Sequence, residues 1–507
     1  MSASPLTLNL LRTTSIPPPS ISSHSPLSHL PTPTTRIHFN AKPKPSISSK
    51  PISILTPYAA LSDPFVLQIA ETLEDSLSSS SSSSSSTPLL QKLRDSSSES
   101  LLSVSWPTRK DEPFRFTDTS FIRTSQIQPT LPPPQESLFS SIPGDTQSPN
   151  LIIVDGYVVD SLSSVSGLPD GVFVGSISKL YSEAAIKRVS EFVASFNGDL
   201  FYSLNGVGAP DLVVLYVPEG CRVENPIHLR YFSVQGSEFG SNTLPTSNPR
   251  VLMLVEKGAE VNIVEEYVGG EENKCYWTNS VLELAIGEGA TVSHSYIQSQ
   301  SLGAAHIKWT SVRQESASTY NLVELSTGAK LSRHNLHIQQ AGPGTVTELS
   351  ALHLSVNDQT QDLHSRLILD HPRGFSRQLH KCIVAHARGQ AVFDGNIRVN
   401  RYAQQTDAGQ LTRSLLLVPQ ATVNVKPNLQ IIADDVKCSH GAAISDLEED
   451  QLFYFQARGI DLDTARKALL FSFGAEVIER IPFASIRDKA KRRIAELLDP
   501  AVQPSAT

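Results

Sequence analysis

A recurring unit of strand and turn constrains the fold of this chain more than any other feature of its sequence. Short runs of β-branched and apolar residues are each followed by a tight turn, a small residue and an alternating segment. Copies of the unit begin at Val251, Val281, Tyr320, Cys382 and Leu415. On this pattern we place in one register Val261, Val292, Leu331, Val392 and Val423. Irregular repetition of this kind is typical of a β-solenoid, although a β-sandwich also has short strands and remains an alternative.

The first part of the chain has the composition of a targeting sequence. No Asp or Glu occurs between Met1 and Ser62, whereas Arg and Lys are scattered among many Ser, Thr and Pro residues. This composition is typical of an organelle transit peptide. Proline breaks the amphipathic helix that a mitochondrial presequence needs, so the abundance of proline favours the chloroplast. We expect residues 1–60 to be a chloroplast transit peptide and the mature chain to reside in the chloroplast stroma.

Helical patterns flank the strand-rich region on both sides. Asp63 followed by Pro64 predicts a helix start, and an unbroken serine run then extends from Ser78 to Ser86. We therefore expect an N-terminal helical region with Ser/Pro-rich linkers over residues 61–150. The strand pattern then predicts a β core over residues 151–444.

Residues 445–507 return to a helical period. Ser445 and Glu448 match a capping box, and a second helix is predicted to start at Asp461 or Asp463. That second helix is apolar nearly all round, since Leu469, Leu470, Phe471 and Phe473 follow one another closely. Such a helix is expected to be buried on several sides, either within its own domain or against a partner.

Composition excludes several classes of function. The formal net charge is −8, so the chain lacks the basic surface of a nucleic-acid-binding protein, and we expect no nucleic-acid partner. No stretch is apolar enough to predict a membrane span. The irregular spacing of Cys221, Cys275, Cys382 and Cys438 argues against a disulfide framework and indicates thiols in a reducing compartment.

Familiar catalytic motifs are missing from the sequence. It contains no GxxxxGK[ST], GxSxG or HExxH pattern and no paired CxxC. We therefore expect no ATP site in this chain, and the missing motifs argue against a catalytic role with a familiar chemistry; the resemblance described below implies a non-catalytic subunit.

The most suggestive chemistry lies in the segment ADDVKCSHG. On a strand, Cys438 and His440 project to the same face and together offer a thiolate and an imidazole, which suit iron, zinc or persulfide sulfur. Two ligands are too few for a closed metal site, so a partner chain would have to complete it. Buried core residues are the alternative for this pair. For His380 and Cys382, which repeat the spacing, the core interpretation is favoured.

Long stretches around this pair carry a family resemblance. The segments FDGNIRV, QTDAGQLTRSLLL, KPNLQIIADDVKCSHGAAI and EDQLFYFQARGI resemble the SufD branch of the SufB/SufD family, and WPTRKDEPFRFTD is similar to the family's N-terminal motif. The resemblance extends from about Trp106 to Ile481. It favours a functional role for Cys438 and His440 over the core alternative.

The resemblance implies a mainly β fold, with a right-handed parallel β-helix core flanked by N-terminal and C-terminal α-helical domains. Family members assemble with SufB and the ABC-type ATPase SufC. The β-helices pair, SufC docks on the C-terminal helices, and ATP-driven SufC dimerisation twists the core to expose its ligands. Persulfide-delivering proteins of the SUF pathway are indirect partners.

Mapped onto this chain, the resemblance implies that Cys438 and His440 bind iron of a transient iron–sulfur cluster shared with SufB. It also implies a docking segment for SufC at about residues 449–481. The docking residues we expect there are Leu452, Phe453, Leu469, Phe473 and Val477.

Three alternatives remain at this point. A β-helix polysaccharide-active enzyme would need a cleft of clustered carboxylates and usually a secretory signal, and neither is apparent. The chain could also be a SufB-like subunit that receives sulfur directly, although the CSHG segment favours the SufD branch. The third alternative is a purely structural partner of SufB without cluster ligands.

Overall fold

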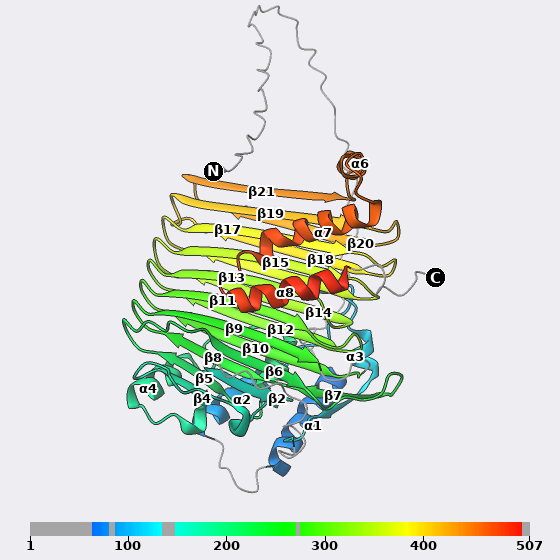
Figure 1. The fold of residues 1–507 in the computed structure, drawn as a ribbon. Helices are drawn as coiled ribbons and strands as arrows, with labels where there is room; N and C mark the ends of the chain where they lie inside the picture. The colour runs from blue at the N-terminus through cyan, green and yellow to red at the C-terminus, as the bar shows by residue number, and fades with distance from the viewer. Residues whose placement is uncertain (1–62, 81–86, 134–147, 270–273, 499–507) are drawn as a thin grey trace, which may run out of the picture. The chain divides into compact units, whose positions relative to one another are not determined.

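A computed structural model describes residues 63–80, 87–133, 148–269 and 274–498 of the 507-residue chain. The predicted transit peptide, the end of the serine run and much of the connector before residue 150 lie outside the described residues. Within them, two β-sheets face each other and helices lie at both ends of the sequence (Figure 1). The mainly β prediction is confirmed.

The core is a parallel β-solenoid in which each coil gives one strand to each sheet. We call the two sheets A and B. The coil strands of sheet A are β8 (Arg250–Val255), β10 (Trp277–Ile286), β12 (Ala305–Gln314), β14 (Leu331–Gln340), β16 (Thr360–Leu369), β18 (Gln390–Val399) and β20 (Thr422–Ile431). Those of sheet B are β9 (Glu260–Gly269), β11 (Thr291–Ser299), β13 (Thr319–Ser326), β15 (Val346–Ser355), β17 (Phe375–Val384), β19 (Thr406–Leu416) and β21 (Val436–Ser445). All neighbouring coil strands within a sheet pair in parallel.

The common register predicted for the repeat is wrong in part. Val261 and Val292 are cross-strand partners in sheet B, as expected, whereas Leu331 begins a strand of sheet A. In sheet A, Val423 pairs with Ala391 and not with Val392. The repeat mixed two kinds of corner, because a tight turn and a small residue suit the passage from A to B and the passage from B to A equally well.

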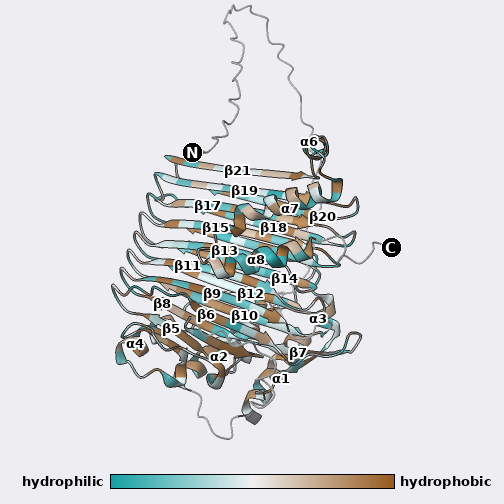
Figure 2. Ribbon diagram, viewed as in Figure 1, coloured by the Kyte–Doolittle hydropathy of each residue, from teal (hydrophilic) through white to brown (hydrophobic). Residues whose placement is uncertain are grey.

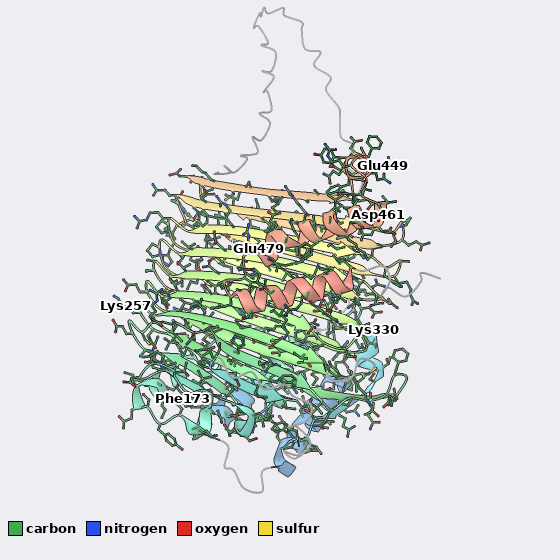
Figure 3. The ribbon with its side chains drawn as sticks, in the orientation of Figure 1. Phe173, Lys257, Lys330, Glu449, Asp461 and Glu479 are labelled. Carbon is green, nitrogen blue, oxygen red and sulfur yellow. The ribbon has the colours of Figure 1, made fainter. Side chains whose placement is uncertain are left out.

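Both kinds of corner are visible on opposite edges of the coil stack. Lys257 lies in the turn from β8 to β9, and Lys330 lies in the turn from β13 to β14 (Figure 3). The chain therefore changes sheet twice in every coil. The apolar side chains of the interior meet between the two sheets in one large cluster, which includes Leu284, Val292 and Ile338.

The N-terminal part contains helices as well as the strands that begin the two sheets. Its helices are α1 (Pro64–Ser80), α2 (Pro88–Leu101), α3 (Ser120–Thr124), α4 (Glu183–Phe192) and α5 (Leu200–Gly208). Its strands are β1 (Gln126–Pro129), β2 (Asn150–Val154), β3 (Tyr157–Val158), β4 (Phe173–Ser176), β5 (Val213–Val217), β6 (Ile227–Ser233) and β7 (Thr243–Ser247). The helix start at Pro64 is confirmed. Helices α4 and α5 interrupt the stretch for which the sequence predicted only strands.

An aromatic cluster fixes the N-terminal helices to the outer face of sheet A. Trp106 makes edge-to-face contacts with Phe201 of α5 and with Trp277 of β10, with ring centroids 5.3 and 6.5 Å apart. Offset and edge-to-face arrangements suit the charge distribution of aromatic rings. In Figure 2 the hydrophobic colour is strong in this part of the fold, around β5 and β8.

The C-terminal helices are α6 (Glu449–Gln456), α7 (Leu462–Ile478) and α8 (Ala484–Leu497). The capping-box prediction is wrong, because Ser445 ends β21 and the N-cap of α6 is Glu448, which makes no side-chain capping bond. The predicted start of α7 is confirmed, since the Asp461 carboxylate accepts a hydrogen bond of 2.9 Å from the Thr464 amide.

Helices α7 and α8 lie on the outer face of sheet B (Figure 1). Val477 and Ile494 pack there against strand residues such as Leu352 and Leu379. The described helices include none long and apolar enough to cross a membrane. The apolar side chains predicted for α7 are thus largely buried against sheet B of the same chain.

Candidate functional site at the last coil

The solenoid ends at an open coil. Strand β20 pairs only with β18, and β21 pairs only with β19, within the described part of the chain. The outer backbone edges of these two strands therefore lack ladder partners. Most residues of β20 and β21 are half-buried or exposed, in contrast to the buried strands of the middle coils. Unpaired edges of this kind are templates for pairing with another chain.

Cys438 and His440 lie on β21 at this open end. Their cross-strand partners on β19 are Ala408 and Gln410. The Cys438 side chain is half-buried and packs against the interior cluster between the sheets. Because side chains alternate along a strand, His440 is on the same face as Cys438. His440 is exposed, since no further coil covers it.

The environment of Cys438 favours the neutral thiol. Partial burial raises the pKa of the Cys438 thiol, and a backbone hydrogen bond with Ala408 opposes this shift without cancelling it. A thiolate at this position therefore needs an additional stabilising charge, such as a bound cation. The predicted thiolate is a property to be expected of a loaded site and not of the chain by itself.

The pair does not form a complete metal site within this chain. The described residues contain no group of three or more His, Cys, Asp or Glu side chains that could hold a metal ion. Asp434 and Asp435 lie close in sequence but are exposed in the turn before β21. A metal bound by Cys438 and His440 would thus require ligands from another molecule.

The pair with the same spacing two coils earlier in sheet B, on β17, is different. Cys382 is 0% exposed, and burial raises the pKa of its thiol to about 12. His380 is also fully buried, stacks on Phe393 and shares a 3.0 Å hydrogen bond with the hydroxyl of Thr412. The core interpretation of His380 and Cys382 is confirmed, and Cys382 offers a matched control for Cys438.

A polar column leads from the interior to His440, and sequence reasoning missed it. Gln378, Gln410 and His440 are successive cross-strand neighbours in sheet B. The Gln410 amide Nε2 donates to Gln378 Oε1 at 2.8 Å, and Gln378 Nε2 donates to the Ser365 hydroxyl at 2.6 Å. The signal was present as polar residues at inward-facing positions, but strand assignment alone does not tell the inward face from the outward face.

The structure separates the residues expected for partner docking into two groups. Val477 is 1% exposed, and Phe473 packs partly buried against the same sheet B cluster. Leu452 is 9% exposed and Leu469 is half-buried, whereas Phe453 on α6 is 70% exposed. Val477 therefore has no free surface for a partner.

Two interactions hold α7 against sheet B where Phe473 lies. Lys381 of β17 donates a 2.8 Å hydrogen bond to the backbone oxygen of Phe473, and its ammonium lies 4.2 Å from the centroid of the Phe473 ring. Lys381 also pairs with Glu476. In Figure 3, Glu449 marks the start of α6 beside the last coils, and Asp461 marks the start of α7. The exposed aromatic surface of α6 is therefore anchored near the open end.

Comparison with known proteins identifies relatives over most of the chain. Residues 238–473 match the domain described as "SUF system FeS cluster assembly, SufBD core domain", and residues 75–229 match the "SufBD protein N-terminal region". Together these two matches span both the helical N-terminal part and the solenoid.

Individual relatives come from plants and bacteria. The chain is 63% identical to the chloroplastic protein ABCI7 of Arabidopsis thaliana over 441 residues, which cover 87% of this chain and 92% of the relative. It is 35% identical to a SufBD-family iron–sulfur cluster assembly protein of Synechocystis, over 80% of this chain and 91% of the relative. Identity to the iron–sulfur cluster assembly protein SufD of Escherichia coli is 28%, over 79% and 91%.

Proposed function

The chain belongs to the SufBD family of iron–sulfur cluster assembly proteins, and we propose that it acts as the SufD-type scaffold subunit of a SufB–SufC–SufD complex. The observation that carries this proposal is the position of Cys438 and His440 on the unpaired terminal strand. Two potential ligands lie where a second chain can both extend the sheets and supply the ligands that are missing.

SufB is the proposed partner at the open coil. The free backbone groups of β20 and β21 can continue their ladders into the sheets of a second solenoid. Such pairing would bury the half-exposed Cys438 and the exposed His440 at the interface. The polar column of Gln378 and Gln410 would then place His440 between a polar interior and the partner.

In the proposed function, iron and sulfide are the substrates of assembly. Cys438 and His440 would supply this subunit's share of a nascent cluster, with Cys438 as thiolate and His440 as neutral imidazole. Because burial raises the pKa of the Cys438 thiol, deprotonation is coupled to binding of iron. The site is then empty and protonated until iron arrives, which limits premature reaction of the thiol.

SufC is the proposed partner of α6. Phe453 and Tyr454 are 70% and 55% exposed, whereas Leu452 is nearly buried and Leu469 is half-buried. Phe473 and Val477 would act indirectly, by fixing α7 to sheet B. A displacement of α6 by SufC would thus be transmitted through α7 to the solenoid. ATP hydrolysis would occur on SufC, and this chain would serve as a non-catalytic subunit.

The remaining parts of the proposal concern location and supply. The leader composition and the chloroplastic relative support residence in the chloroplast stroma. Persulfide-delivering proteins of the SUF pathway would supply sulfur indirectly, through SufB. A purely structural partner of SufB, without cluster ligands, is the competing interpretation.

Co-expression of the mature chain with SufB and SufC tests the proposal. The expected result is a three-component complex whose iron and sulfide content falls when Cys438 or His440 is replaced. An assembled complex with unchanged iron and sulfide would establish the purely structural role instead.

A further inference from the structure

A second candidate site lies on the outer face of sheet A, whereas Cys438 lies on β21 of sheet B. Strands β12, β14, β16 and β18 of sheet A form its floor, and the segments around Phe114 and Asp199 form its rim. The cavity has a volume of about 460 Å³, within the range of about 300–1,000 Å³ that is usual for small-molecule sites. None of the residues that line it belongs to the undescribed segments.

The acidic groups around the cavity already have partners. The Asp199 carboxylate accepts hydrogen bonds from the amides of Phe201 and Tyr202 and, at 2.8 Å, from Trp309 Nε1. The Asp394 carboxylate pairs with Lys426 at 3.4 Å. These carboxylates are therefore engaged and do not determine what else the cavity can bind.

A buried ion pair beside the cavity is also fully formed within the chain. Arg333 Nη1 donates to Asp362 Oδ2 at 2.6 Å, and both side chains are buried. His364 also contacts Asp362, at 3.0 Å. The charge of Arg333 is thus neutralised within the chain.

Beside these pairs lies a row of polar side chains that lack hydrogen-bond and ion-pair partners among the described residues. His337, Arg366 and Asn396 are successive cross-strand neighbours on β14, β16 and β18, so they share one face of sheet A. Within the described part of the chain, the side chains of Arg366 and Asn396 have no hydrogen-bond or ion-pair partner, and His337 makes only a ring contact with Trp309 at 4.5 Å. Next to this row, Asn335 is 3% exposed, and its Nδ2 has no hydrogen-bond acceptor among the described residues.

The side chains of this row and of Asn335 are mainly hydrogen-bond donors, and they include one full positive charge. Arg366 is exposed, so its guanidinium is accessible to a ligand. Burial, together with the nearby Arg366, lowers the pKa of His337 to about 4, so its imidazole is neutral at physiological pH. A neutral imidazole and two amides can complete the hydrogen bonding of an anion that a single guanidinium binds.

We propose that the cavity of His337, Arg366 and Asn396 binds a small oxyanion, the phosphate or carboxylate group of a small molecule. Arg366 would bind two of its oxygens side by side, because the planar guanidinium matches the geometry of both groups. Asn396 and His337 would flank it on the neighbouring strands, about 4.8 Å to either side. This ligand would bind independently of the proposed cluster site, which lies on sheet B.

Calorimetric titration of the full-length mature chain with inorganic phosphate and with acetate tests the proposal. At least one of the two should bind with a Kd in the millimolar range, about 1 mM, or tighter. Arg366→Gln should weaken binding at least about tenfold, and Arg366→Lys should recover only part of it because a lysine cannot bind two oxygens in parallel. Arg401→Gln is the matched control, since Arg401 is an exposed arginine in the turn after β18 and lies outside the cavity.

The titrations distinguish between a phosphate ester, a carboxylic acid and the absence of a specific site. Tighter binding of phosphate points to a phosphate ester, and tighter binding of acetate points to a carboxylic acid, and either supports the site. No binding of either anion up to about 10 mM would overturn the proposal. Equal weakening by Arg366→Gln and Arg401→Gln would also overturn it, because general surface charge would then explain the binding. An unchanged melting temperature of each variant without ligand verifies that the fold is intact.

Discussion

Lys308 and Glu265 form a buried ion pair across the interior of the solenoid, with Lys308 Nζ 3.0 Å from Glu265 Oε1. Lys308 lies on β12 of sheet A and Glu265 on β9 of sheet B, and both side chains are 0% exposed. The hydroxyls of Tyr231 and Tyr267 donate to the same carboxylate at 2.9 and 3.1 Å. The two sheets are therefore joined by a hydrogen-bonded charge pair as well as by apolar packing.

Removal of one member of this pair should destabilise the fold strongly. Lys308→Ala leaves the Glu265 carboxylate buried without its cation, and a loss of about 3–5 kcal/mol in the free energy of unfolding is expected. Denaturant unfolding followed by circular dichroism measures it. Lys257→Ala is the control, because the Lys257–Glu288 pair is exposed and its loss should have no measurable effect.

The double variant Glu265→Gln/Lys308→Met separates the two contributions. It removes both charges, so it should be clearly more stable than Lys308→Met, which has the same side-chain volume at this position but leaves the Glu265 carboxylate unpaired. Equal stability of the two variants would show that lost packing, and not the unpaired charge, accounts for the effect.

Asp155 should make the stability of the fold depend on pH. Burial raises the pKa of its carboxyl to about 6, despite opposing hydrogen bonds from the amides of Val234 and Gln235. Between pH 4 and 6 the unfolded chain then releases this proton before the folded chain does. The contribution of Asp155 to stability is therefore greatest below pH 4, decreases as pH rises, and stays low above pH 6.

Asp155→Asn should remove this component. The position has a φ of 51°, a left-handed conformation that asparagine tolerates well. Relative to the variant, the wild-type chain should lose on the order of 2 kcal/mol between pH 4 and 7. Unfolding curves of both proteins across this range provide the measurement, and parallel pH profiles would refute the assignment.

Phe453 should be required for docking of SufC but not for folding. Because its ring is 70% exposed, Phe453→Ser should leave the melting temperature unchanged and reduce co-purification of SufC at least about tenfold. Phe239→Ser, at another exposed aromatic residue with 79% exposure, is the control. Undiminished recovery of SufC with the Phe453 variant would place the docking surface elsewhere.

Point variants are preferable to truncation for this test. Deletion from Glu449 onward would remove α7 and α8 and expose the apolar outer face of sheet B, where Leu352 and Ile383 are 0% exposed. A truncated chain that failed to bind SufC would then be uninformative, since the solenoid itself would be destabilised.

The parts of the fold that depend on local signals could be predicted from the sequence. The helix start at Pro64 and the N-cap at Asp461 follow from local chemistry, as does the strand character of the repeats. The assignment of Val261 and Leu331 to different sheets could not be predicted, because both corner types share one local pattern. The prediction that Ser445 caps a helix was wrong because of a contact between distant strands. Ser445 pairs with Leu415 of β19 and therefore ends β21.

The candidate site was predictable only as a pair of residues. The alternation of a strand places Cys438 and His440 on one face, but their position at an unpaired end depends on how many coils form and where the chain leaves the stack. Contacts between distant strands form the interior column of Gln378 and Gln410. They also form the row of polar side chains around Arg366. Such contacts have no local sequence signature.

The proposed cluster site is tested most directly by the iron and sulfide content of the proposed complex with SufB and SufC, purified with wild-type chain, Cys438→Ala, His440→Ala or Cys382→Ala. His440 is exposed and Cys438 half-buried, so these two variants should fold and assemble normally. We predict that both lose most of the bound iron and sulfide, whereas Cys382→Ala, which alters a fully buried core residue, reduces stability and leaves the content per assembled complex unchanged. Assembled complexes of Cys438→Ala and His440→Ala with wild-type iron and sulfide would contradict the account.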